Sequence, residues 1–418
     1  MTDEQVAAVS NRYQRAVAGG DDPHDWAYAW RAELNRGGFR AVDFLMDEIV
    51  GNGKCVGCAA CVTICPTDVF DYIDEQPTAA REDACVQCVL CADVCPVLRP
   101  PDANLPGELG LKQPIKDDGY GPYSYELYAR SSRPEIVSRT QDGGVVSTIL
   151  INELRRGNIR GAIVGDTDPD DPQIGRHKLA MTESDILSCG GSRYTYSPNT
   201  LALQQAMAQD IRPVAVVGVP CQVDGIRLQQ HSSIRMEINR WYRSNVPLVI
   251  GLFCSEAFTH ESLDSLAERF EIERKDIENI NIKGKVIVRM TGGRTESMSL
   301  KKLRAYARPA CLYCTDYTAE NSDIGVGGIG LDDWSFVAVR TEAGHKALQQ
   351  AIEDGHLDTK PIEDFAKGKE ILVRLAQQKI GRPLPAFMPT LQEREETGDL
   401  DPKEFGDKLA ALARGETV

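Results

Sequence analysis

The stretch that decides the fold reads CVGCAACVTICP from Cys55 to Pro66 and CVQCVLCADVCP from Cys85 to Pro96. Each half has the spacing C-x2-C-x2-C-x3-C-P, which binds a pair of [4Fe–4S] clusters. Three thiolates two residues apart wrap one cubane, and the fourth, before proline, reaches the neighbouring cluster. The spacing therefore predicts one cluster on Cys55, Cys58, Cys61 and Cys95, and a second on Cys85, Cys88, Cys91 and Cys65.

Other uses of these cysteines fit the spacing poorly. A structural zinc site needs only one C-x2-C pair from each half and would leave thiols over. A disulfide framework belongs to secreted chains, and the opening MTDEQVAAVS has no basic segment followed by an apolar one. Thirteen cysteines without an export signal indicate metal ligation in a reducing compartment.

Composition narrows the class of protein further. The 418 residues carry a formal net charge of −15, whereas a nucleic-acid-binding surface would be basic. A hydrophobic content of 42% suits a globular chain, and no apolar run is long enough to span a membrane. We therefore expect a cytoplasmic protein, peripheral in a larger complex, with no nucleic-acid partner and no membrane insertion.

The chain divides into five predicted segments. Residues 1–50 form a helical extension whose apolar stripes either pack on the protein or dock a partner subunit. Residues 51–100 are the small 2[4Fe–4S] ferredoxin-like module, with a hairpin predicted in the spacer between Pro66 and Asp83. Residues 101–124 are a linker rich in Pro and Gly, 125–375 a larger domain, and 376–418 a charged helical tail.

The larger domain alternates strands with helices. Short buried strands are predicted at Gly161–Val164, Val214–Val219 and Pro247–Phe253, and helices at Gly144–Arg155, Leu201–Gln209 and His260–Phe270. Such alternation favours a mixed or parallel sheet. The predicted fold class is mixed α/β (α+β), with the small cluster module ahead of a mixed-sheet domain.

Four further cysteines offer a third metal site. Cys221 and Cys254 each follow a predicted strand, at the sheet edge where open α/β proteins collect ligands. Cys311 and Cys314 add a C-x2-C pair. Four thiols suffice for a third cubane, but buried cysteines also serve simply as small apolar residues, and spacing alone does not decide between the two. Cys189 has no partner in this scheme, and we assign it no role.

Several motifs of the larger domain resemble the flavin-binding beta subunit of coenzyme F420-reducing hydrogenase. They occur in the family's order over about 125–375: QDGG from Gln141, SRYTYSPN from Ser192, VPCQ from Val219, GLFC from Gly251, CLYCTDY from Cys311 and DWS from Asp333. The resemblance implies one FAD, a facing F420 site and a [4Fe–4S] cluster on Cys221, Cys254, Cys311 and Cys314.

The position of the ferredoxin-like module points to particular relatives. With that module in front, the chain looks like the input subunit of archaeal F420H2 dehydrogenases or the amino-terminal half of F420-dependent sulfite reductase. The resemblance implies coenzyme F420 as substrate and a protein redox partner of the hydrogenase, formate dehydrogenase, membrane F420H2 dehydrogenase or heterodisulfide reductase type.

Two stretches are the candidate FAD contacts. Asp142, Gly143 and Gly144 precede a predicted helix, where backbone N–H groups can approach a pyrophosphate, although such a turn is often only a turn. No Rossmann G-x-G-x-x-G fingerprint accompanies it. Hydroxyl and cationic groups gather in the second stretch, whose candidates are Ser192, Arg193, Tyr194, Thr195, Ser197, Pro198 and Asn199.

The basic set predicted for the anionic tail of F420 comprises Lys283, Lys285, Arg289, Arg304 and Arg308. Taken together, these features predict an oxidoreductase subunit that exchanges a hydride between F420 and FAD and passes single electrons through three clusters. No catalytic acid or base is assigned, because the cofactors supply the chemistry. A free-standing reductase of an organic substrate and a flavin-free electron-transfer adaptor are the alternatives.

Overall fold

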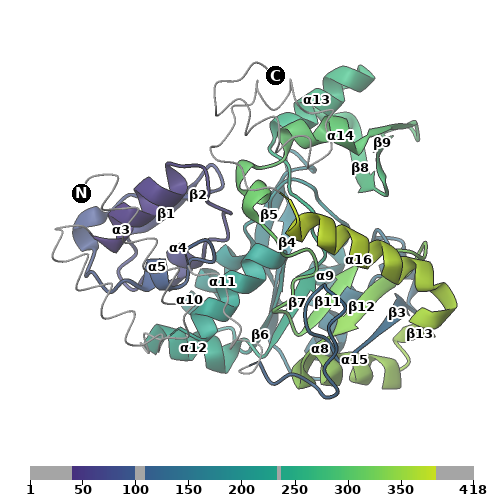
Figure 1. Ribbon diagram of the computed structural model, residues 1–418, viewed down its shortest axis with the longest axis horizontal. Helices are drawn as coiled ribbons and strands as arrows, with labels where there is room; N and C mark the ends of the chain where they lie inside the picture. The colour runs from purple at the N-terminus through teal and green to yellow at the C-terminus, as the bar shows by residue number, and fades with distance from the viewer. Residues whose placement is uncertain (1–39, 99–108, 233–236, 383–418) are drawn as a thin grey trace.

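The computed structural model describes residues 40–98, 109–232 and 237–382. These residues form an eight-stranded sheet, a three-stranded sheet and a two-stranded hairpin, with helices packed around them (Figure 1). The predicted mixed α/β class, with a small module beside a mixed-sheet domain, is confirmed. The helices predicted within residues 1–39 and the charged tail after 382 lie outside the described residues. None of the described helices is long and apolar enough to cross a membrane.

The small module begins ten residues earlier than predicted. Its hairpin pairs β1 with β2 and places Phe70 opposite Ala79. Residues 41–50, predicted as part of a separate extension, pack Phe44 and Leu45 into the same core as Phe70. The module contains α3 (Ala41–Phe44), the π-helix η1 (Leu45–Val50), α4 (Ala60–Ile64), β1 (Phe70–Ile73), β2 (Gln76–Ala79), the 3-10 turn η2 (Glu82–Ala84) and α5 (Leu90–Asp93).

The large sheet runs in the order β13-β3-β12-β11-β7-β6-β4-β5. Its four central strands, β11, β7, β6 and β4, are parallel, and the outer pairings are antiparallel. All three predicted strands lie here as β4, β6 and β7. The strands are β3 (Tyr125–Ser131), β4 (Gly161–Thr167), β5 (Gly175–Ala180), β6 (Val214–Gly218), β7 (Leu248–Leu252), β11 (Ile324–Gly327), β12 (Ser335–Val339) and β13 (Leu357–Pro361).

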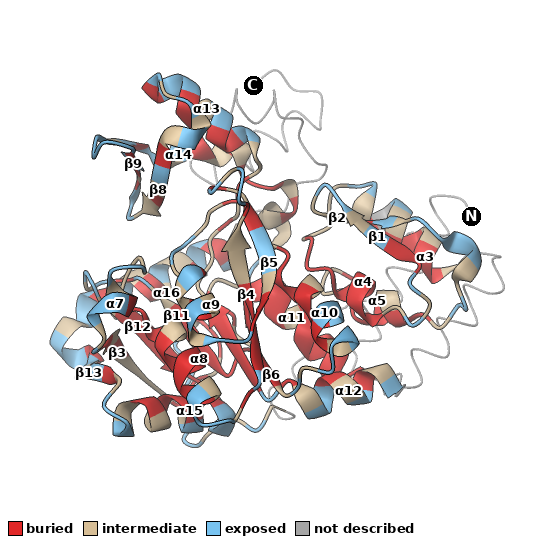
Figure 2. Ribbon diagram, turned by 180° about the vertical axis from the view of Figure 1, so that it is seen from behind, coloured by how far each residue is buried: buried red, intermediate tan, exposed pale blue. Residues whose placement is uncertain are grey.

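Helices cover both faces of this sheet. On β6, Ala215 and Val217 face a core shared with α8 and α15, while Val214 and Val216 face a second core on the other side. That second core contains Cys58 and Leu90 of the small module, so the module packs directly on the sheet domain; Figure 2 shows buried residues where α4 meets α11. The helices are α7 (Pro134–Val137), α8 (Val145–Arg155), α9 (Glu183–Ser188), η3 (Asn199–Leu201), α10 (Ala202–Ala208), α11 (Pro220–Gln230), α12 (Glu237–Asn245) and α15 (Glu342–Glu353).

A separate three-stranded sheet, which the sequence analysis did not predict, stands to one side (Figure 1). Its middle strand alternates buried Val286, Val288 and Met290 with exposed Lys285 and Arg289. The apolar face packs on the predicted helix at 260–270. This subdomain comprises α13 (Glu261–Phe270), η4 (Arg274–Asp276), β8 (Ile277–Ile282), β9 (Lys285–Met290), β10 (Thr295–Ser299), α14 (Leu300–Leu303) and η5 (Arg304–Tyr306).

The last described helix, α16 (Ala366–Ile380), follows the 3-10 turn η7 (Ile362–Phe365). The predicted domain boundary at 375 falls inside α16, whose Leu372 and Ala376 are buried against the sheet domain. Residues 109–124, predicted as part of a surface linker, bury Tyr120 and Tyr123 in the same core. Both segments thus belong to the sheet domain.

Substitution of Gly368 is expected to loosen α16. A Cβ on Gly368 would lie 1.8 Å from the hydroxyl of Tyr128 and 3.1 Å from the Cα of Gly330. Overpacking of this kind costs about 1–3 kcal/mol, so Gly368→Ala should lower the thermal midpoint measured by circular dichroism. The double variant Gly368→Ala/Tyr128→Phe frees the space and should recover part of that loss. Equal melting of wild type and Gly368→Ala would contradict the tight packing.

Candidate iron–sulfur and cofactor site

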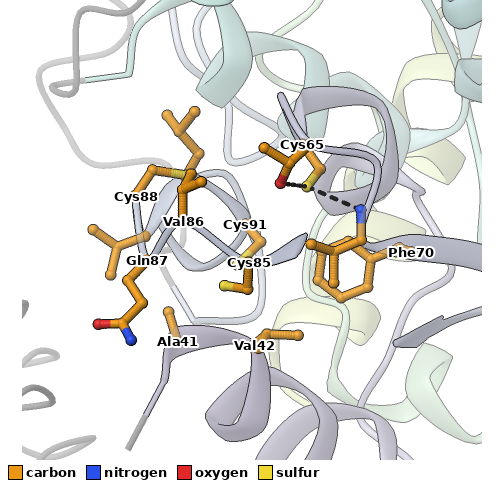
Figure 3. Close-up of a pocket in the computed structure, with 13 residues that line it drawn as sticks. Ala41, Val42, Cys65, Phe70, Cys85, Val86, Gln87, Cys88 and Cys91 are labelled. Atoms are coloured by element: carbon orange, nitrogen blue, oxygen red, sulfur yellow. Dashed lines mark hydrogen bonds between the residues drawn. The ribbon is translucent and has the colours of Figure 1, made fainter. Parts of the chain in front are cut away.

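A pocket at the surface of the small module is lined by the four cysteines predicted for the second cluster. Figure 3 shows Cys65, Cys85, Cys88 and Cys91 around it, with Ala41 and Val42 of α3 on one side and Phe70 on another. Four thiols on an apolar lining form a donor set that suits a [4Fe–4S] cluster. Val86, between two of the cysteines, is 56% exposed, so this pocket lies close to solvent.

The two cysteine loops of the module share an unusual backbone. Gly57 and Gln87 have φ values of 71° and 55°, and Ala59 and Val89, two residues further on, both have 58°. A positive φ is a genuine outlier for a β-branched residue such as Val89. The repetition of this conformation at equivalent places in both C-x2-C-x2-C loops indicates that the backbone serves to direct the thiols.

The structure brings together Cys55, Cys58, Cys61 and Cys95, the set predicted for the first cluster. Burial raises the pKa of Cys58, and the neighbouring Cys95 and Cys55 raise it further. Burial also raises the pKa of Cys61, and four neighbouring thiols raise it further: Cys58, Cys55, Cys95 and Cys91. Closely spaced buried thiols resist ionisation unless a cation compensates them, as cluster iron would.

The candidate third set comes from three separated parts of the sheet domain. Cys221 lies in the first turn of α11, Cys254 follows β7, and Cys311 lies in the 3-10 turn η6 (Pro309–Tyr313), with Cys314 just after it. Burial raises the pKa of Cys221 well above its ordinary value, and Cys314, Cys58, Cys254 and Cys311 contribute in the same direction. The fold thus gathers the four thiols that the family resemblance implies.

The three sets form a continuous series. Cys61 and Cys95 of the first set share one apolar core with Cys91 of the second set. Cys58 of the first set contributes to the raised pKa of Cys221. The helix α11, which carries Cys221 in its first turn, packs directly on Cys58: a Cβ on Gly225 would lie 3.3 Å from the Cys58 sulfur. The order is therefore third set, first set, second set, ending at the exposed pocket.

The arrangement of the thiols does not match a mononuclear metal site. Among the described residues, no group of three or more His, Cys, Asp or Glu side chains is placed to hold a single metal ion. A cubane has a different requirement, because each of its four thiolates binds a separate iron atom.

Arg308 joins the small module to the sheet domain. Its guanidinium forms an ion pair with Glu75 at 3.0 Å, donates to the carbonyl of Val56 at 2.9 Å, and lies 4.1 Å from the ring centre of Tyr196. Arg308 is 5% exposed. The charge of Arg308, predicted to belong to the basic set for the F420 tail, is thus committed to the contact between the two parts of the chain.

Two cations that the sequence analysis did not single out reach the third set from the end of α16. Lys379 donates to the carbonyls of Cys254 and Asp316, both at 2.7 Å, and Arg382 donates to the carbonyl of Cys311 at 3.0 Å. Burial alone would lower the pKa of Lys379, but Cys314, Cys254, Cys311 and Asp316 outweigh it and hold the pKa above its ordinary value.

The predicted pyrophosphate turn lies where β3 and β11 end. Gly143 has no room for a side chain, because a Cβ would lie 2.4 Å from the carbonyl oxygen of Ala129. Gly144, with φ 70°, precedes α8 directly. Asp142 forms an ion pair with Lys283 at 3.0 Å; burial raises the pKa of Asp142 and Lys283 opposes the shift.

Most polar groups of the second predicted FAD stretch already have protein partners. Thr195 donates to the carbonyl of Gln173, Ser197 to that of Arg176, and Asn199 to that of Val217. Arg193 donates to three carbonyls, Tyr194 contacts Gln141, and Pro198 is buried, whereas Ser192 is exposed. These contacts fix the loop between α9 and η3 against β5 and β6, and the role of this stretch in binding FAD stays a prediction.

The remaining members of the predicted basic set are dispersed. Lys283 pairs with Asp142 and Asp332, close to the pyrophosphate turn. Lys285 and Arg289 are exposed on β9. Arg304 pairs with the buried Glu256 at 2.9 Å. Of the five, Lys283 is the cation placed beside a candidate cofactor turn.

Comparison with known families agrees with this division of the chain. Residues 127–204 match the model described as coenzyme F420 hydrogenase/dehydrogenase, beta subunit N-term, and residues 211–365 match its counterpart for the carboxy terminus of the same beta subunit. Residues 54–99 match the 4Fe-4S dicluster domain. The matched segments therefore cover both the sheet domain and the cysteine-rich module.

Individual relatives point the same way. The coenzyme F420 hydrogenase subunit beta of Methanosarcina barkeri is 34% identical over 288 residues, 68% of this chain and 96% of that protein. A coenzyme F420-dependent sulfite reductase of Methanocaldococcus jannaschii is 30% identical over 74% of this chain and 48% of its own length. A chain of the F420-reducing [NiFe] hydrogenase complex from Methanosarcina barkeri superimposes with a TM-score of 0.59 at 34% identity, covering 64% of this chain and 91% of that one. The protein belongs to the coenzyme F420 hydrogenase/dehydrogenase beta-subunit family.

Proposed function

We propose that this chain exchanges a hydride between coenzyme F420 and a bound FAD and passes single electrons through three [4Fe–4S] clusters to or from a partner protein. The observation that carries the proposal is the continuous series of thiol sets, from strand ends of the F420-family domain to the exposed pocket of the small module. Membership of the family supports F420-linked redox chemistry.

The cysteines supply the ligands for the clusters. Cys221, Cys254, Cys311 and Cys314 would hold the cluster of the sheet domain, next to the edge where the candidate FAD turn also lies. Cys55, Cys58, Cys61 and Cys95 would hold the middle cluster, and Cys65, Cys85, Cys88 and Cys91 the outer one. The close packing of Gly225 of α11 on Cys58 keeps the third set adjacent to the first.

The candidate FAD residues are those of the Asp142–Gly144 turn. When bound, FAD would accept two electrons together as a hydride and release them singly. The chain contributes the backbone N–H groups at the start of α8, which favour an anion. Lys283 neutralises Asp142, so that the carboxylate does not repel a phosphate placed at the turn.

The outer pocket is the end of the series that a partner would approach. Residues 40–98 contain three Lys or Arg against ten Asp or Glu, a net charge of −7. A redox partner with a basic face would be steered to this surface and would bind with a strong dependence on ionic strength.

The test is anaerobic reduction of the purified protein with F420H2 and, separately, with NADH, followed by visible absorbance. We expect F420H2 to bleach the flavin bands and the broad iron–sulfur absorption, and NADH to bleach neither. Iron and FAD contents of the same sample measure the number of cofactors directly.

Two results would contradict the proposal. Bleaching by NADH but not by F420H2 would replace F420 with a nicotinamide as the hydride carrier. A preparation that contains iron but no flavin, and does not react with F420H2, would identify the chain as an electron-transfer adaptor.

A further inference from the structure

The end of α16 lies beyond the segment that matches the family models, which ends at residue 365. It nevertheless reaches the third cysteine set. Lys379 is 4% exposed, and its ammonium donates to the carbonyls of Cys254 and Asp316. A buried lysine is rare unless an anion accompanies it, because removing its charge from water is costly.

Arg382 provides a second cation at the same place. Its side chain is 8% exposed and donates to the carbonyl of Cys311 at 3.0 Å, with Glu256 3.9 Å away. Lys379 and Arg382 thus hold carbonyls of two candidate ligands that come from different loops. Glu256 also forms an ion pair with Arg304, so its single negative charge does not neutralise both Arg304 and Arg382.

Neutral donors would satisfy these carbonyls as well and would avoid the cost of burying charge. A cluster with four thiolate ligands is anionic and gains another negative charge when it is reduced. In an interior of low dielectric constant, a nearby cation stabilises the reduced state more than the oxidised state. Net charge and hydrogen bonding around a cluster are among the factors that set its reduction potential.

We propose that Lys379, assisted by Arg382, raises the reduction potential of the third cluster and so makes it a better acceptor of single electrons from the flavin. This inference rests on the proposed function, because it requires the cluster on Cys221, Cys254, Cys311 and Cys314. Lys379 acts through its charge and is not itself a ligand or a catalytic group.

The experiment is a potentiometric titration followed by electron paramagnetic resonance on the full-length protein with its cofactors. For Lys379→Met we expect the midpoint potential of the third cluster to become more negative by at least about 59 mV. For a one-electron couple, this shift changes the ratio of reduced to oxidised cluster tenfold. Lys379→Arg keeps the charge and should stay close to wild type. Lys367→Met, which removes an exposed lysine from the start of the same helix, is the matched control.

An unchanged midpoint in Lys379→Met with full iron content would overturn the inference and leave Lys379 a structural hydrogen-bond donor. If Lys379→Met fails to retain the cluster, the same titration is made on Arg382→Gln. A smaller shift of the midpoint potential to more negative values supports the inference, and an unchanged midpoint refutes it. A wild-type protein with three clusters but no effect of either variant would refute only the tuning role. A wild-type protein with only the two module clusters would refute the proposed function as well.

Discussion

The variant Cys221→Ala is expected to stop electrons from F420H2 from reaching the two clusters of the small module. Cys221 is both a candidate ligand of the third cluster and the thiol whose neighbours include Cys58 of the first set. Its loss should lower the bound iron by about a third. Removal of an outer-shell partner of a metal site typically lowers activity by roughly 10- to 100-fold. Because Cys221 is a candidate direct ligand, we expect the rate of reduction of an external one-electron acceptor to fall by more than this.

Visible absorbance distinguishes reduction of the flavin from reduction of the clusters. In Cys221→Ala, F420H2 should still bleach the flavin while the remaining iron–sulfur absorption persists. Cys189→Ala provides the control, because Cys189 is a buried cysteine of the same domain that lies outside the three sets. Normal transfer in Cys221→Ala, or equal iron loss in both variants, would be incompatible with the proposed series of clusters.

The second large effect concerns stability. Arg308→Met removes the ion pair with Glu75, the hydrogen bond to Val56 and the contact with Tyr196 in one step. Breaking a fully buried ion pair costs about 3–5 kcal/mol. The side chain of Glu75 is still 19% exposed, so we expect a loss below that range, about 2–3 kcal/mol, with a fall in the thermal midpoint of roughly 2–4 °C for a chain of 418 residues.

Two controls define the origin of this loss. Adding Glu75→Gln to Arg308→Met removes the uncompensated carboxylate and should restore part of the stability, which a double-mutant cycle would measure. Arg289→Met breaks an ion pair with Glu278 on the exposed face of β9 and should change stability by no more than about 0.5 kcal/mol. Similar losses in Arg289→Met and Arg308→Met would mean that the contact between the two parts of the chain is unimportant.

Local patterns of sequence predicted much of this fold. β4, β6 and β7 were predicted because buried parallel strands are nearly continuous apolar runs, and the grouping of the module's cysteines followed from their spacing. β9 was missed, although Val286, Ile287 and Val288 form a run of β-branched residues between Lys285 and Arg289, a composition typical of a strand. That signal was available in the sequence.

Other features depended on tertiary structure. α16 carries many charged residues, so its end was assigned to a solvated tail. Nothing in its local pattern indicates that Lys379 is buried, because the carbonyls it contacts belong to loops at Cys254 and Asp316. The ion pair of Arg308 was not predicted for the same reason: its partner Glu75 is more than two hundred residues away in the chain.

The position of α16 at the end of the described chain has a consequence for synthesis. During translation the eight cysteines of the small module leave the ribosome first, and the third set is complete only with Cys314. Lys379 follows 65 residues later, which corresponds to roughly 3–13 seconds at usual elongation rates. Throughout that interval the loops of Cys254, Cys311 and Cys314 lack the cations that later hold them. We therefore expect the third set to be more open to cluster insertion during this interval than after α16 has packed on it.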